Sequence, residues 1–139
     1  MRYELLNGSN LAYLGDAYYE LQIRNYLLSK NITKTKDLRE VSIEFVSAKS
    51  QAFIMNQLLS NLNEEEMKIY LRGRNAVHMI HRKNVDPKEY LIASGFEALI
   101  GYLYLKKDEK RLDEIIKSAI DIVEANNDHL WEKYRSRSN

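Results

Sequence analysis

The chain has 139 residues and carries 21 basic and 20 acidic side chains, which gives a formal net charge of +1. This length fits one domain, residues 1–139, that can bury a core without disulfides or a structural metal. The absence of cysteine excludes a thiol nucleophile, a zinc–cysteine site and a disulfide framework. The balanced charge excludes a globally basic surface, so contacts with nucleic acid would have to be local.

We expect neither a targeting segment nor a membrane span. Residues 1–14 lack a basic head followed by an apolar run, and no stretch approaches the roughly 20 apolar residues that cross a bilayer. The expected location is therefore the cytoplasm, with no membrane partner. The last residues, about 128–139, are expected to form a frayed C-terminal tail.

Two long helices are predicted in the first half of the chain. One begins at about Ser9 or Asn10 and runs to Lys30, with apolar residues on almost every side of its first half. Such a distribution is typical of a buried helix. A second begins near Thr35 and continues to about Leu59, with apolar residues at three-to-four spacing on one face. This one-faced pattern predicts that it packs against the first helix.

Three more helices are predicted in the second half. Asn63, followed by three glutamates, forms an N-cap with an acidic first turn, and this helix should loosen near Gly73. Asp86 followed by proline opens the next helix, which runs to about Lys106. A last amphipathic helix ends near residues 126–127. With one proline and no run of alternating apolar and polar residues, we predict an all-α helical bundle.

The main basic stretch runs from Arg72 to Lys83, RGRNAVHMIHRK, and contains no acid. Because the whole chain is almost neutral, this segment is the predicted place of contact with RNA phosphates. Its two histidines lack a third ligand at metal spacing, so we do not expect a zinc site there. The residues predicted to bind RNA are Arg72, Arg74, Asn75, His78, Arg82 and Lys83.

Acidic residues lie inside the two most apolar helices. Asp16 and Glu20 are the charged residues between Leu11 and Ile23, and Glu97 is the one between Tyr90 and Leu105. Asp16 and Glu97 have no cation within helical reach. A buried, unpaired carboxylate is unfavourable, so each must be exposed, paired across helices, protonated or bound to a metal ion.

Glycines accompany these acids. Gly15, Gly95 and Gly101 lie inside the same helices, where each costs about 1 kcal/mol relative to alanine. Close helix packing would offset that cost, so Gly15 and Gly95 could bring Asp16 and Glu97 together at a crossing. Oxygen ligands of this kind suit Mg²⁺, with Mn²⁺ as a substitute. The alternative is that both acids are surface residues or partners of arginines, and that the glycines serve packing alone.

Two motifs resemble the catalytic domain of the ribonuclease III family. LAYLGDAYYE, residues 11–20, resembles the family's signature helix, of the form LEFLGDA. GFEALIGYLYL, residues 95–105, resembles its second acidic motif, of the form DxFEALxGAxYL. The RGRNA sequence at 72–76, the short chain and the missing double-stranded-RNA-binding domain are similar to the Mini-ribonuclease III group.

The resemblance implies roles for individual residues. Asp16 matches the aspartate of LGDA and Glu97 the glutamate of FEAL, and in the family both bind catalytic magnesium. The family's other two acids are replaced here by Ala12 and Ser94. Ser94, three residues before Glu97, is expected to border the metal.

The resemblance also implies a function. The implied protein is an all-α homodimer that uses magnesium to cut double-stranded RNA and leaves 5′-phosphate ends. The expected substrate is a precursor of large-subunit (23S) ribosomal RNA, and a ribosomal protein is a further candidate partner. The alternative is a catalytically inactive RNA-binding or ribosome-assembly subunit with the same fold, which Ala12 and Ser94 would favour.

Overall fold

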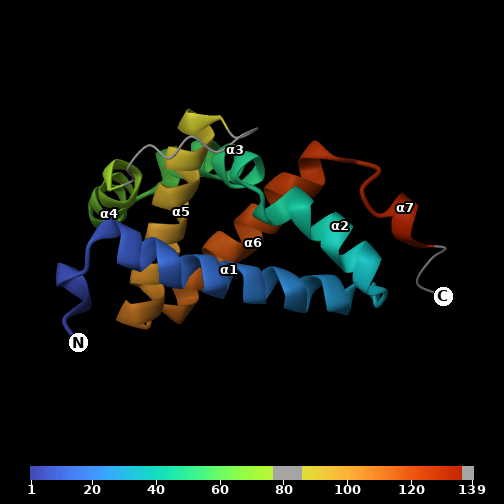
Figure 1. Ribbon diagram of the computed structural model, residues 1–139, viewed down its shortest axis with the longest axis horizontal. Coiled ribbons are helices and arrows are strands. Elements are labelled where there is room, and N and C mark those ends of the chain that lie inside the picture. The colour runs from blue at the N-terminus through green and yellow to red at the C-terminus, as the bar shows by residue number, and fades with distance from the viewer. Residues whose placement is uncertain (77–85, 136–139) are drawn as a thin grey trace.

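The computed structural model describes residues 1–76 and 86–135, and over these ranges the fold is all-α, as predicted (Figure 1). Short 3₁₀ turns cover Tyr3–Leu5 and Leu59–Asn61. The α-helices are α1 (Gly8–Ser29), α2 (Thr35–Val46), α3 (Ala48–Leu58), α4 (Glu64–Asn75), α5 (Pro87–Lys106), α6 (Glu109–Asn126) and α7 (Glu132–Arg135).

Helix α5 is the centre of the bundle, and it packs against α1, α3 and α4 (Figure 1). It starts as the sequence predicts, because the Asp86 carboxylate accepts a hydrogen bond from the Lys88 backbone N–H at 2.8 Å and proline occupies the first turn. Every residue from 98 to 103 is buried, so the helix has no solvent face there. Even so, no helix within the described ranges is long and apolar enough to cross a membrane.

The predicted second helix is two helices, α2 and α3, so its prediction as one continuous element is wrong. Ser47 breaks it with an extended ψ of 156°, and its hydroxyl accepts a hydrogen bond from the Ser50 backbone N–H. The break has a packing reason. It turns α3 so that Gln51, Met55 and Leu58 face the interior and α5.

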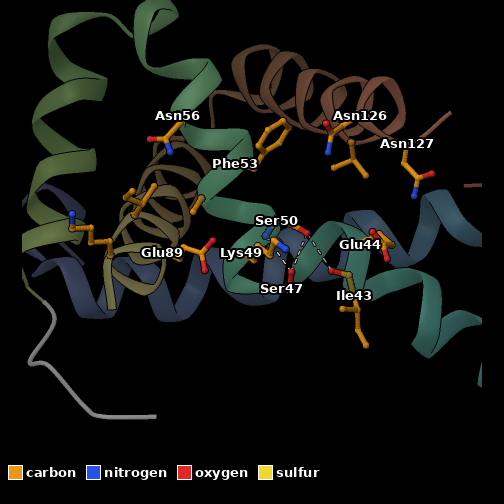
Figure 2. Close-up of a pocket in the computed structure, with 14 residues that line it drawn as sticks. Ile43, Glu44, Ser47, Lys49, Ser50, Phe53, Asn56, Glu89, Asn126 and Asn127 are labelled. Atoms are coloured by element: carbon orange, nitrogen blue, oxygen red, sulfur yellow. Dashed lines mark hydrogen bonds between the residues drawn. The ribbon is translucent and has the colours of Figure 1, made fainter. Parts of the chain in front are cut away.

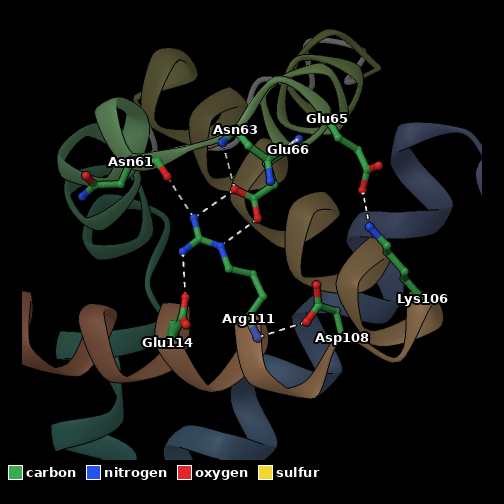
Figure 3. A network of polar contacts seen from close by, with 8 residues as sticks. All are labelled: Asn61, Asn63, Glu65, Glu66, Lys106, Asp108, Arg111 and Glu114. Carbon is green, nitrogen blue, oxygen red and sulfur yellow. Dashed lines mark hydrogen bonds and ion pairs between the residues drawn. The ribbon is translucent and has the colours of Figure 1, made fainter.

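A buried ion pair joins α4 to α6 (Figure 3). Glu66 is 2% exposed, and both its oxygens accept hydrogen bonds from Arg111, at 2.7 Å from Nε and 2.9 Å from Nη2. Glu66 also accepts from the Asn63 backbone N–H, which completes a capping box at the start of α4. Arg111 donates further to the Asn61 carbonyl and to Glu114. Each group in this network therefore has a partner, as a buried charge requires.

The C-terminal segment beyond about residue 128, for which we predict fraying, contacts the bundle as far as Tyr134. Leu130 and Tyr134 are buried, and the Trp131 indole N–H donates to Glu124 at 2.7 Å. Glu124 also accepts a hydrogen bond from the Tyr26 hydroxyl, so this cluster ties the C-terminal segment to α1. Apolar burial and shared hydrogen bonds hold these residues against the bundle in this structure.

Candidate active site

The site lies where α1 crosses α5 with almost no side chains between the two backbones. A Cβ on Gly15 would overlap the Glu97 carbonyl, and one on Gly101 would overlap the Leu11 carbonyl. Glycine is therefore required at both positions for this approach. Gly95 has a different role from the one we expected, because it faces Tyr70 of α4 and not α1. The crossing is made by Gly15 and Gly101.

This crossing brings Asp16 and Glu97 together, which is the juxtaposition expected from the two motifs. The two carboxyl groups lie within hydrogen-bonding reach of each other. Asp16 is exposed on α1, whereas Glu97 is half-buried on α5. Among the described residues, no lysine or arginine forms an ion pair with either carboxylate. Glu20, one turn along α1, pairs instead with Arg24 at 3.6 Å.

Glu97 therefore holds its proton far above the usual pH range of a carboxyl group. Burial is the main cause that raises the pKa of Glu97, from 4.5 to about 9, and the adjacent Asp16 carboxyl is the next. The negative charge of Glu20 raises this pKa further, while a hydrogen bond from Gln51 lowers it. The raised pKa favours the protonated form of the Glu97 carboxyl at neutral pH, as expected for a partly buried acid beside another acid.

Gln51 is a site residue that sequence reasoning missed. Its side chain is 2% exposed, and Nε2 lies 3.2 Å from the Val46 carbonyl and 3.5 Å from Glu97 Oε2. The available signal was a glutamine on the same helical face as the buried Met55 and Leu58. A polar residue on an apolar face calls for a buried partner.

Ser94 contacts α4 in this structure, and its place beside a bound metal stays a prediction. Its hydroxyl donates a hydrogen bond to the Gly73 carbonyl of α4 at 3.2 Å, and the residue is buried. Ala12 is buried as well. Among the described residues, no cluster of three or more metal-binding side chains forms, so the site contains the two acids Asp16 and Glu97 without the further pair found in the longer family pattern.

Part of the predicted RNA-binding segment forms the C-terminal turn of α4. Arg72, Arg74 and Asn75 are all exposed there. Arg72 has an additional structural contact, because its guanidinium donates to the carbonyls of Glu4 at 3.0 Å and Leu6 at 3.3 Å. The other three predicted residues, His78, Arg82 and Lys83, lie outside the described residues.

A pocket of about 580 Å³ opens between α2, α3, the start of α5 and the end of α6 (Figure 2). Two lysines and two glutamates line it together with Phe53, so its charges balance. Neither Asp16 nor Glu97 lines this pocket. Phe53 lies about 200° around α3 from Gln51, so the two side chains are on opposite sides of that helix. The candidate site is therefore the open crossing of α1 and α5.

The carboxylate pair fits a hard divalent cation. Two acids in contact without a basic partner can be neutralised by a proton or by a metal ion. Magnesium commonly uses one or two carboxylates, with water completing its coordination sphere, so Asp16 and Glu97 suffice as protein ligands. The same pair would not form a zinc site, which needs three or four protein ligands of mainly nitrogen and sulfur.

Comparison with known proteins agrees with this geometry. Residues 9–108 match the Ribonuclease III domain, which includes both acidic motifs. Mini-ribonuclease 3 of Clostridium tetani is 41% identical over 134 residues, 96% of this chain and 89% of the relative. Mini-ribonuclease 3 of Enterococcus faecalis is 45% identical over 128 residues, 91% of this chain and 97% of the relative.

A solved structure shows the same fold. The crystal structure of a protein from Fusobacterium nucleatum superposes with a TM-score of 0.77 at 33% identity, and covers 84% of this chain and 93% of that one. The matched domain and relatives carry ribonuclease activity in their names, which implies activity on RNA. The chain therefore belongs to the ribonuclease III family, in the group of the Mini-ribonucleases 3.

Proposed function

We propose that this chain is an endoribonuclease that cuts double-stranded RNA with Mg²⁺, or Mn²⁺ in its place, and leaves 5′-phosphate and 3′-hydroxyl ends. The observation that carries the proposal is the contact between Asp16 and Glu97 at a close helix crossing, with no basic partner among the described residues. A structural ion pair would supply a cation. This pair instead suits an ion that arrives with the substrate.

The two carboxylates would hold the metal, one from each helix. When bound, the cation supplies a Lewis acid that stabilises negative charge on the phosphate and activates water as the nucleophile. Glu97 must release its proton for the pair to bind a cation with both acids ionised. The close Gly15–Gly101 approach brings the two helix backbones together, so the two acids would start from neighbouring positions when the cation binds. The chain needs no side-chain nucleophile.

RNA recognition would use shape and charge. Arg74 and Asn75 are exposed at the end of α4, where they can contact phosphates and 2′-hydroxyls of an A-form duplex. The proposed substrate is a precursor of large-subunit (23S) ribosomal RNA. That role would place the protein in the cytoplasm and makes a ribosomal protein a candidate partner. Its support is the similarity to Mini-ribonucleases 3.

The proposed active form is a homodimer with one site for each RNA strand. Its support is three exposed apolar residues of α1, of which Tyr13 is 83%, Leu21 55% and Leu28 52% exposed. The three lie within about 80° of one another around the helix, and exposed apolar side chains on one face favour a covered surface. Light scattering should give twice the monomer mass of 16.4 kDa. A particle of monomer mass at working concentrations would contradict the dimer.

One experiment tests the activity itself. Purified protein is incubated with long double-stranded RNA and Mg²⁺, and in parallel with excess chelator. We expect cleavage to short duplexes with 5′-phosphate ends in the first reaction and intact RNA in the second. RNA binding without cleavage under both conditions would instead support an inactive RNA-binding subunit, the function that Ala12 and Ser94 favour.

A further inference from the structure

Gln51 of α3 contacts the carboxylate pair from a third helix. It is the buried glutamine of α3, at 2% exposure, and the residues beside it on that inner face are apolar. An aliphatic side chain of similar volume would fill the same space without placing an amide in the interior. A buried amide is unfavourable unless its hydrogen bonds are made. Its contacts therefore indicate what the amide does there.

The orientation of the Gln51 amide follows from its neighbours. The Val46 carbonyl and Glu97 Oε2 lie 3.2 Å and 3.5 Å from Nε2, and both are oxygens that can accept. The Val46 carbonyl can only accept, so rotating the amide by 180° would place Oε1 against an acceptor there, and Nε2 must therefore face it. In this orientation Oε1 has no hydrogen-bond partner among the described residues. Among the described residues, the amide therefore has partners for its N–H groups but none for its carbonyl oxygen.

We propose that Gln51 is a positioning residue, whose Nε2 holds the Glu97 carboxyl toward Asp16 and fixes it to the α2–α3 corner through the Val46 carbonyl. This inference rests on the proposed function, since it concerns the same site. The donor acts on the orientation of Glu97 and does not itself touch the metal or RNA. Outer hydrogen bonds of this type commonly set the affinity of metal-binding carboxylates. With only two acids available here, the orientation of each matters more.

The test is a Mn²⁺ titration of the intact RNA-free protein, in which the free ion is followed by electron paramagnetic resonance. Gln51→Met keeps the length and volume of the side chain and removes the donor. Ser94→Ala is the matched control, because it also removes one buried hydrogen bond to a backbone carbonyl but faces α4 and not Glu97. Gln51→Leu is the second variant if Gln51→Met does not fold, and circular dichroism confirms that each variant is folded.

We expect Gln51→Met to bind Mn²⁺ about 10- to 100-fold more weakly than the wild type, while Ser94→Ala keeps the wild-type affinity. Wild-type affinity in the folded Gln51 variant, or an equal loss in Ser94→Ala, would overturn the inference. Glu97→Gln separates this failure from a failure of the proposed function. Wild-type Mn²⁺ affinity in Glu97→Gln would contradict the proposed metal site, and so would the absence of saturable binding by the wild type. Either result would also remove the proposed role of Gln51.

Discussion

Two buried or half-buried glutamates, Glu66 and Glu97, lie in opposite electrostatic surroundings. Glu66 accepts two hydrogen bonds from Arg111 and one from a backbone N–H, so its charge is fully compensated. Glu97 contacts Asp16 and a single amide donor, and the pKa of its carboxyl is raised to about 9. The first glutamate joins two helices. The second has no basic partner among the described residues, which is more frequent at functional sites than elsewhere in proteins.

The largest expected effect is on cleavage. Asp16→Asn and Glu97→Gln keep the shape of the side chain but remove a carboxylate that would bind the cation. A bound cation stabilises the transition state by several kcal/mol, so each variant should slow cleavage at least about a thousandfold. Gel-based single-turnover assays on double-stranded RNA measure this loss. Glu66→Gln is the matched control, and its activity should stay near the wild-type value at temperatures where it is folded. Undiminished cleavage by Glu97→Gln would remove the distinction between the two glutamates.

The next largest effect is on stability, where replacing Glu66 should have the larger effect and replacing Glu97 the smaller. Glu66→Gln removes the buried anion that accepts from Nε and Nη2 of Arg111 and leaves Glu114 as the remaining anionic partner, so it should lower the free energy of unfolding by roughly 3 kcal/mol, as for other buried ion pairs. Glu97→Gln should leave the stability of the metal-free protein unchanged or raise it, because a buried acid is removed. Urea unfolding followed by circular dichroism compares the two. Equal losses would mean that Glu97 has a structural role after all.

The pH dependence of stability tests the raised pKa of Glu97. Since the pKa of Glu97 is raised from 4.5 to about 9, the folded state keeps a proton that the unfolded state releases above pH 4.5. The stability contributed by this group is therefore complete below pH 4.5 and is lost as pH rises toward 9. Metal-free melting temperatures should fall over this interval, and Glu97→Gln should flatten the fall. Parallel curves for the two proteins would refute the raised pKa.

The smallest effect concerns two arginines of α4. Arg74→Ala should weaken RNA binding uniformly across sequences and reduce the salt slope by about one counterion. Arg72→Ala should in addition lower stability by about 1 kcal/mol, because its guanidinium also holds the carbonyls of Glu4 and Leu6. Filter binding over a salt series, with melting curves beside it, separates the two. An unchanged salt slope in both variants would assign both arginines to structure.

The elements with strong local signals could be predicted from the sequence. Asn63 and Asp86 cap α4 and α5 as predicted, because a cap depends on residues within one turn. The pairing of Asp16 with Glu97 was also expected, since acids in apolar helices next to glycines constrain where those helices meet. The break at Ser47 could not be read from periodicity, because apolar spacing continues across it.

Features that depend on the packing of a third helix were missed. Ser94 shares a turn with Glu97, yet its hydroxyl meets the Gly73 carbonyl because α4 lies on that side of α5. Gln51 reaches Glu97 only after the chain has turned at Ser47. Helical spacing places residues around one helix, but it does not say which neighbour each one faces.

We predict that the Asp16–Glu97 pair exchanges a proton for a divalent cation. Mn²⁺ is added to weakly buffered, RNA-free protein at pH 7, and the released protons are counted with a pH indicator. Because the pKa of Glu97 is raised to about 9 in the metal-free protein, saturation should release about one proton per chain. Glu97→Gln should release none. Saturable Mn²⁺ binding without proton release by the wild type, or the same release by Glu97→Gln, would contradict the account.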